Sequence, residues 1–343
     1  MTVSETILTV RDLSTHFRTE EGTVRAVDGV SFTMNRGDIM ALVGESGSGK
    51  SVTGLSLLRL VPRPGKIVAG QVLFKGEDLL TKSEKEMRHY RGNRISMIFQ
   101  NPNTSLDPAF TVGEQIVETI RLHTPQSRTD AIRQASQMLG LVGIPDPLST
   151  LNHYPHSMSD SMRQRVMIAM ALSCKPDLLV ADEPTTALDV SVQAQILDLL
   201  EQLNRELGTA ILMITHDMGV VSRLCKTVAV MYAGQIVEYA SKDVTMNQPQ
   251  HPYTTGLMNS VPRVGSHSRT LKEDGTLSQR QRLFQIDGAP PNLANLPPGC
   301  PFAPRCREAA EVCRSQTPPV IGVGSDHLVR CLMREKAGEQ HAG

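Results

Sequence analysis

The sequence predicts an α/β fold that is built around a parallel β-sheet. Strand-like runs (LLVAD, AILMIT, TVAVMY) alternate with stretches of helical periodicity over residues 178–232, the pattern of parallel strands joined by helices. Two β-rich segments in residues 26–44 lead into a glycine-rich turn. Residues 83–175 show mostly the apolar spacing of helices, so we expect a helical subdomain there.

The individual elements follow the same rules along the chain. AVDGVSFTMN and DIMALVG are β-rich and bounded by glycine, which predicts strands over 26–35 and 38–44. SVTGLSLLRLV predicts a helix over 51–61, and GQVLFKGEDL predicts another strand and turn. After residue 262 the chain is rich in serine and glycine (RVGSHSRTLKEDGTLSQRQR), which indicates a linker into a small cysteine-bearing tail.

Composition narrows the class of protein. Lys and Arg number 35 in the 343 residues, as do Asp and Glu, so we expect no nucleic-acid partner. The longest apolar runs are strand-length, far short of the ~20 residues that a membrane-spanning helix needs. The start of the chain, MTVSETILTV, lacks the basic and apolar segments of a signal peptide. We therefore expect a cytoplasmic protein.

The stretch GESGSGKS matches the phosphate-loop pattern G-x-x-x-x-G-K-[ST], between a predicted strand and a predicted helix. Glycines let backbone N–H groups wrap around the β-phosphate of a nucleotide in conformations that a side chain would block. The lysine supplies a charge to the β- and γ-phosphates, and the final serine a hydroxyl to Mg²⁺. The predicted nucleotide-binding residues are Gly44, Glu45, Ser46, Gly47, Ser48, Gly49, Lys50 and Ser51.

Polar side chains follow three predicted strands. LLVADEP places Asp182 at the end of a buried strand, where it can hold Mg²⁺, and Glu183 next to it, where it can orient or deprotonate a water. In MIFQNP, Gln100 follows a strand, and its neutral side chain is suited to contact a Mg²⁺-bound water. His216 ends the next strand in ITHD; a lone histidine is more often structural, but here it can reach the γ-phosphate.

Taken in this order and spacing, GESGSGKS, FQNP, SMSDSMRQRVMIAMAL, LLVADEPTTALD and ITHD resemble the ATPase subunit of ABC transporters over residues 5–260. The resemblance implies ATP as substrate and an ABC-type core, residues 1–262, with an antiparallel β subdomain and a helical subdomain at about 83–175. It also implies a switch glutamine at Gln100, a switch histidine at His216 and an adenine-stacking aromatic at Phe17. The family's dimer-interface loop matches Thr186 to Asp189, which adds Asp189 to the nucleotide site.

The end of the chain narrows the resemblance. HPYTTGLMNSVPR and the GCPFAPRC tail are similar to the region after the core in oligopeptide, dipeptide and nickel importers, which implies a C-terminal extension over 263–343. We expect peptide import, with a second ABC ATPase, two transmembrane permease subunits and a periplasmic or extracellular substrate-binding protein as partners. The subunit would sit peripherally on the cytoplasmic face of the cell membrane. Nickel, glutathione or another small solute, or a soluble non-transport ABC ATPase, are the alternatives.

Four cysteines crowd into the tail with the spacing C-x5-C-x6-C-x17-C. Four thiolates can hold Zn²⁺ or an iron–sulfur cluster, although zinc modules usually use closer pairs. The resemblance implies a [4Fe-4S] cluster in some members, and free thiols without metal are the third possibility. The candidate ligands are Cys300, Cys306, Cys313 and Cys331.

The signature motif is the one departure from the family pattern. The family has Ser-Gly-Gly at the start of a helix, and this chain keeps Ser159 but has Asp160 and Ser161 in place of the glycines. A carboxylate repels phosphate, and side chains block close backbone approach, although Ser159 or Asp160 can also simply cap the helix. In a head-to-tail heterodimer this motif would face the partner's ATP, so we expect the partner's site to be weakened.

Overall fold

The computed structural model describes residues 5–185, 189–260 and 285–334. The predicted linker over 263–282 lies outside the described residues. Most of the predicted dimer-interface loop, residues 186–188, lies outside them as well.

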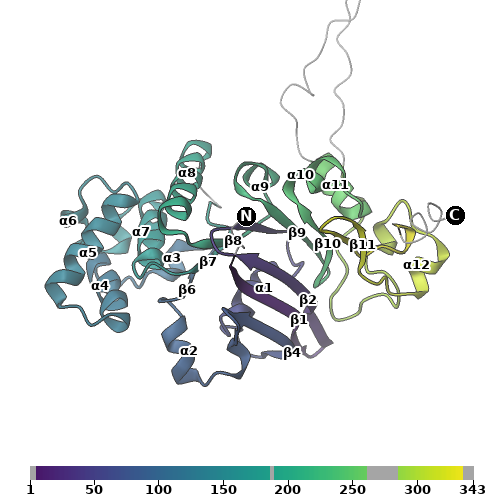
Figure 1. Ribbon diagram of the computed structural model, residues 1–343, viewed down its shortest axis with the longest axis horizontal. Coiled ribbons are helices and arrows are strands. Elements are labelled where there is room, and N and C mark those ends of the chain that lie inside the picture. Colours follow the sequence, from purple (N-terminus) through teal and green to yellow (C-terminus); the bar gives the residue numbers. More distant parts are fainter. Residues whose placement is uncertain (1–4, 186–188, 261–284, 335–343) are drawn as a thin grey trace, which may run out of the picture.

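A sheet of eight strands forms the centre of the molecule, in the order β11-β12-β10-β9-β3-β8-β7-β6 (Figure 1). The five strands from β9 to β6 run parallel, which confirms the predicted parallel sheet. Their carboxyl ends therefore share one edge. The strands are β3 (Ile39–Val43), β6 (Ile95–Ile98), β7 (Leu178–Asp182), β8 (Ala210–Thr215) and β9 (Thr227–Tyr232).

A second, antiparallel sheet has the order β2-β1-β4-β5, as the family resemblance implies. Its strands are β1 (Thr6–Thr19), β2 (Gly22–Asn35), β4 (Gly65–Phe74) and β5 (Glu77–Asp78). Its apolar face packs with α1 (Lys50–Leu57) against the central sheet. The helix is shorter than predicted and is followed by Arg59 in the left-handed region at φ 54°, which continues no helix.

Strand alternation divides the apolar residues between two cores. Successive side chains of a strand point to opposite faces, so Ile39, Ala41 and Val43 of β3 join the core under the helices. Met40 and Leu42 join the core shared with the antiparallel sheet. The central strands are buried on both faces, which explains why they read as continuous apolar runs.

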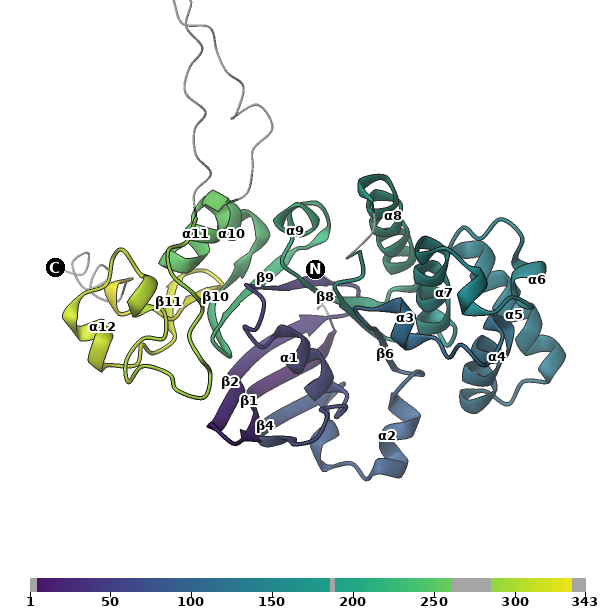
Figure 2. The same cartoon turned by 180° about the vertical axis from the view of Figure 1, so that it is seen from behind.

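The helices after α1 extend from the predicted helical region to the C-terminal part of the chain. The predicted helical region, 83–175, also contributes β6 to the central sheet, whereas α4, α5 and α6 lie together at one end of the molecule (Figures 1 and 2). The helices are α2 (Glu84–Tyr90), α3 (Pro102–Ser105), α4 (Val112–His123), α5 (Arg128–Leu141), α6 (Pro147–Thr150), α7 (Asp160–Leu172), α8 (Val190–Leu207), α9 (Met218–Leu224), α10 (Lys242–Asn247), α11 (Pro252–Ser260) and α12 (Glu311–Ser315). In the described residues, no helix has the length and apolar character to cross a membrane.

The C-terminal part is joined to the central sheet at the opposite end from α4–α6 (Figures 1 and 2). β10 (Gln235–Ser241) pairs with β12 (His327–Val329), and β12 pairs with β11 (Ile321–Gly324). The buried Glu238 of β10 accepts hydrogen bonds from the backbone N–H groups of Gln250 and His251 at 2.7 and 2.9 Å. One of its oxygens also lies 2.8 Å from Nε2 of His327. The C-terminal part is therefore hydrogen-bonded to the central sheet through β12.

Candidate active site

The phosphate-loop motif lies between β3 and α1, as the sequence predicts. Gly44 and Gly49 adopt φ 155° and 104°, and a Cβ at Gly49 would lie 2.0 Å from the carbonyl oxygen of Ala26. No side chain fits in that space, so glycine is required there for the loop to close over the antiparallel sheet.

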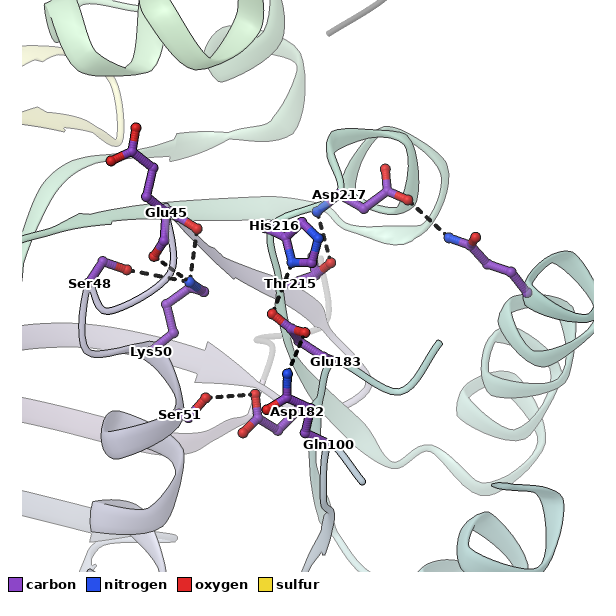
Figure 3. A network of polar contacts seen from close by, with 12 residues as sticks. Glu45, Ser48, Lys50, Ser51, Gln100, Asp182, Glu183, Thr215, His216 and Asp217 are labelled. Carbon is purple, nitrogen blue, oxygen red and sulfur yellow. Dashed lines mark hydrogen bonds and ion pairs between the residues drawn. The ribbon is translucent and has the colours of Figure 1, made fainter. Parts of the chain in front are cut away.

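Lys50 holds the loop together from inside. Its ammonium donates hydrogen bonds to the carbonyl oxygens of Gly44 and Glu45, both at 2.8 Å, and to Oγ of Ser48 at 3.4 Å (Figure 3). Burial lowers the pKa of Lys50, and the nearby carboxylates of Glu183, Asp182 and Glu45 oppose that shift. A buried cation within a glycine-rich loop is suited to bind an anion such as a triphosphate.

Ser51 and Asp182 lie next to each other across the edge of the sheet. The Ser51 hydroxyl donates to Oδ1 of Asp182 at 3.1 Å (Figure 3). Burial, with the added charge of Glu183, raises the pKa of Asp182, while the Ser51 hydrogen bond and Lys50 oppose the rise. A hydroxyl and a carboxylate are hard oxygen ligands, and a buried carboxylate gains from a cation, so these residues fit Mg²⁺.

Glu183 is held between two side chains from neighbouring strands. Oε2 accepts a hydrogen bond from Nε2 of Gln100 at 2.8 Å, and Oε1 lies 2.9 Å from Nδ1 of His216 (Figure 3). The three residues follow β6, β7 and β8, whose carboxyl ends share one edge. Glu183 itself adopts φ 45°, and its backbone N–H donates to the carbonyl oxygen of Ile214 at 2.9 Å.

This arrangement brings the predicted residues Gln100, Asp182, Glu183 and His216 to the same edge as the phosphate loop. The loop offers a cation and hydroxyl groups for phosphate and metal, and the carboxylate of Glu183 is oriented by two neighbours. Such a site is suited to nucleotide hydrolysis with water as the nucleophile.

Comparisons with known proteins agree with this geometry. The family model described as ABC transporter matches residues 27–186, and the one described as oligopeptide/dipeptide transporter, C-terminal region, matches residues 237–313. The probable peptide ABC transporter ATP-binding protein y4tR of Sinorhizobium fredii is 51% identical over 96% of this chain and 95% of its own length. The chain belongs to the ATP-binding proteins of ABC transporters. It is therefore an ATPase.

Other relatives of this ATPase carry related names. The dipeptide transport ATP-binding protein DppD of Bacillus subtilis is 47% identical, covering 98% of this chain and 97% of its own. The oligopeptide transport ATP-binding protein OppD of Salmonella typhimurium is 46% identical, covering 95% and 93%. A solved dimeric ATP-binding cassette, MJ0796 with ADP and phosphate, has a TM-score of 0.63 at 25% identity and covers 69% of this chain and 99% of its own.

Asp217 is a residue of the ATPase site that sequence reasoning missed. Its backbone N–H donates to Oγ1 of Thr215 at 3.0 Å, and its carboxylate accepts from the backbone of Gly219 at 2.7 Å and from Nε2 of Gln193 at 2.9 Å. These bonds fix the turn that presents His216 (Figure 3). The signal was available, because an aspartate directly before a helix is a favoured N-cap.

The signature region begins α7. Ser159 is the N-cap, and its hydroxyl accepts the backbone N–H of Met162 at 3.3 Å. Asp160 is in the first turn, exposed, and forms an ion pair with Arg163 one turn along. Arg163 also donates to the carbonyl oxygens of Pro155 and Met158 at 3.1 and 2.8 Å. The expected cap is therefore Ser159, and the charge of Asp160 has a partner within its own helix.

Two other predicted nucleotide residues are placed as follows. Asp189 is the N-cap of α8, and its Oδ1 accepts the backbone N–H groups of Ser191 and Val192 at 3.0 and 2.9 Å. Phe17 is half-buried on β1, and its ring occupies the space beside Gly65 of β4, where a Cβ would lie 2.5 Å from the ring. Its stacking on adenine stays a prediction.

The four tail cysteines are free thiols in this structure. Burial raises the pKa of Cys300 and Cys331, and it raises that of Cys306 to about 11. In the described part of the chain, no three His, Cys, Asp or Glu side chains are gathered so that they could hold a metal ion. The described residues therefore do not support the predicted [4Fe-4S] or zinc site, which stays a proposal.

Proposed function

We propose that this ATPase energises the import of peptides through a membrane transporter. The observation that carries the proposal is that the phosphate loop and the Gln100–Glu183–His216 group lie at the same edge of the sheet. The same chain matches the family model of the oligopeptide/dipeptide transporter C-terminal region. The relatives described above are named for peptide, dipeptide and oligopeptide transport. These names favour peptides over nickel or glutathione.

The residues of the site have distinct roles in this proposal. The loop and Lys50 bind the β- and γ-phosphates, and Ser51, Asp182 and Gln100 hold Mg²⁺, which offsets phosphate charge. Glu183 takes a proton from the water whose oxygen attacks the γ-phosphorus, while the bond to the ADP oxygen breaks. His216 orients Glu183 through its 2.9 Å contact, and it would reach the γ-phosphate of a bound ATP.

The transporter that this function requires has several other subunits. We infer a second ABC ATPase, two transmembrane permease subunits and a periplasmic or extracellular substrate-binding protein. The described residues contain no helix that could cross a membrane, so the permease subunits would hold the ATPase at the cytoplasmic face of the membrane. The similarity to a cassette solved as a dimer supports the pairing of two ATPases.

The pairing is asymmetric in our proposal. A head-to-tail dimer places the start of α7 against the partner's nucleotide, where Asp160 and Ser161 replace the glycines. The ion pair with Arg163 offsets part of the charge of Asp160, but both side chains still obstruct close backbone approach to a phosphate. The partner's ATP would therefore turn over more slowly than the ATP bound by this chain.

A [4Fe-4S] cluster in the tail is a separate proposal. Its support is the spacing of four cysteines and the resemblance to importers that carry such a cluster, and binding would require the thiols to move together and ionise. The test is anaerobic purification of the full chain with measurement of bound iron, bound zinc and visible absorbance. Protein free of iron and colourless would exclude the cluster, and bound zinc would replace it with the zinc alternative.

Transport assays on the assembled complex test the proposed function. The chain is co-expressed with the permeases and second ATPase and reconstituted into vesicles with the binding protein. We expect ATP-dependent uptake of labelled di- and oligopeptides, which Glu183→Gln abolishes. Uptake of nickel or glutathione without peptide uptake would reassign the substrate. ATP hydrolysis by a chain that never associates with permeases would favour a non-transport ATPase.

A further inference from the structure

The second residue of the phosphate loop, Glu45, is bound by the C-terminal part of the chain. The guanidinium of Arg305 forms two parallel hydrogen bonds with its carboxylate, Nη1 to Oε2 at 2.7 Å and Nη2 to Oε1 at 3.1 Å. The hydroxyl of Tyr253 accepts the backbone N–H of Glu45 at 2.8 Å. Side chain and main chain of this loop residue are therefore both held by residues beyond the sheet core.

The contact is buried and well supported. The side chain of Arg305 is only 6% exposed, and its Nε donates to the carbonyl oxygen of Asp287 at 2.9 Å. The guanidinium carbon lies 5.8 Å from the ring centre of Tyr232, which itself packs on Tyr253 with ring centres 4.6 Å apart. Burial lowers the pKa of Arg305, but the hydrogen bonds to Glu45 and Tyr232 outweigh it and raise that pKa.

Glu45 connects this contact to the phosphate-binding lysine. Its carbonyl oxygen accepts one of the two 2.8 Å hydrogen bonds from Lys50, while its carboxylate points away from Lys50 (Figure 3). A shift of Glu45 would therefore move the loop around Lys50. The loop residue also carries a negative charge beside a site for an anionic triphosphate, and Arg305 compensates that charge.

We propose that Arg305 and Tyr253 are positioning residues for ATP binding, acting through Glu45. They hold the phosphate loop in its binding shape, and Arg305 cancels a charge that would otherwise repel the phosphates. Arg305 lies between Cys300 and Cys306, so the cysteine-bearing tail becomes part of the nucleotide site. This inference rests on the proposed function and adds to its ATP site two residues that the family's core motifs do not contain.

Steady-state kinetics of the assembled transporter test the proposal. We expect Arg305→Ala to raise the KM for ATP by about tenfold, the scale of a lost charge-assisted contact, with kcat changed less than about twofold. Arg305→Lys should recover part of the affinity, because it restores charge without the paired hydrogen bonds. Arg307→Ala is the matched control: Arg307 is 65% exposed and pairs with Asp287 on the surface, and its removal should leave KM unchanged.

Removal of the charge on Glu45 separates charge compensation by Arg305 from an effect on folding. In the Arg305→Ala background, Glu45→Gln should recover affinity for a fluorescent ATP analogue, because no uncompensated carboxylate remains. Tyr253→Phe should weaken affinity by about threefold through loss of one neutral hydrogen bond. Thermal unfolding of each variant is measured in parallel.

Two outcomes would overturn the inference. An unchanged KM in Arg305→Ala shows that the contact does not position the loop. A lower Tm with a KM loss that Glu45→Gln fails to recover shows a role in stability alone. Wild-type transporter without ATP hydrolysis would instead overturn the proposed function, so the two failures are distinguishable.

Discussion

The phosphate-loop site of this chain and its signature motif differ in how their charges are balanced. On the phosphate-loop side, Asp182 and Glu183 are adjacent and largely buried, and burial raises the pKa of Asp182. On the signature side, Asp160 is exposed and paired with Arg163 within one helix turn. A bound metal ion can relieve the negative charge of the first region, whereas Arg163 offsets part of the charge of Asp160 in the second. In the proposed head-to-tail dimer, the acids of this chain therefore act on its own ATP, whereas its signature affects the partner's ATP.

The largest expected effect is the loss of ATP hydrolysis when Glu183 is replaced. Glu183→Gln keeps the shape of the side chain and its contact distance to Gln100 but removes the group that accepts a proton. We expect kcat of the assembled transporter to fall by about 100-fold or more, with ATP affinity retained. Phosphate release is the measurement, and Glu206→Gln, an exposed position on α8, is the control. Retention of more than half of the activity would mean that the partner's site does most of the hydrolysis.

The buried carboxylate of Asp182 is expected to lower the stability of the nucleotide-free chain, although ATP hydrolysis needs it. The pKa of Asp182 is raised from its ordinary 3.8, so the folded state binds more protons than the unfolded state between that value and the raised one. The free energy of unfolding therefore falls as pH rises through this window, and the cost remains at neutral pH. Asp182→Asn should remove it and stabilise the nucleotide-free chain by on the order of 1 kcal/mol at pH 7.5.

Denaturant unfolding without nucleotide, from pH 4 to pH 8, is the measurement for Asp182→Asn, and ATP hydrolysis should be lost in the same variant. Asp243→Asn, at a side chain that is 86% exposed, is the matched control and should show no gain. A destabilised Asp182→Asn chain at neutral pH would mean that the Ser51 hydrogen bond outweighs the cost of burial.

Restoring the signature glycines tests the other side. Asp160→Gly with Ser161→Gly should raise ATP turnover of the assembled transporter about two- to fivefold, because the partner's nucleotide gains close backbone contacts. The Asp160→Ala/Ser161→Ala pair removes the charge but keeps a Cβ, so it separates repulsion from steric obstruction. Turnover that stays at the wild-type level in both pairs would remove the basis for asymmetry.

The smallest effect concerns stability at the same helix. Asp160→Ala removes a negative charge near the N-terminus of α7 and an exposed pair with Arg163. We expect thermal or denaturant unfolding to show a loss of about 0.5 kcal/mol. Ser159→Ala, which removes the cap, should cost about 1 kcal/mol. A larger loss for Asp160→Ala than for Ser159→Ala would show that the carboxylate is the stronger support of the helix.

Much of the site could be predicted because its motifs are local. Glycine is needed in the phosphate loop where the backbone conformation or a close contact excludes a side chain. The positions of Asp182 and Glu183 could be predicted from the apolar run of the strand that they end. The fold class followed from the alternation of strands and helices. Gln100 and His216 were expected at the ends of neighbouring strands, and only the structure shows that both contact Glu183. The predicted metal site at the four cysteines stays a proposal, because the described residues contain no group of three ligands that could hold a metal ion.

The sequence by itself determined the parallel sheet, the phosphate loop and the acidic residues at the end of β7, since each depends on residues that are close along the chain. Only the tertiary structure decided that Glu45 is held by Tyr253 and Arg305. Glu45 and Arg305 are 260 residues apart. Their ion pair depends on the packing of the extension against the central sheet, because a contact between distant segments is set by the shared core and leaves no periodic pattern in the sequence.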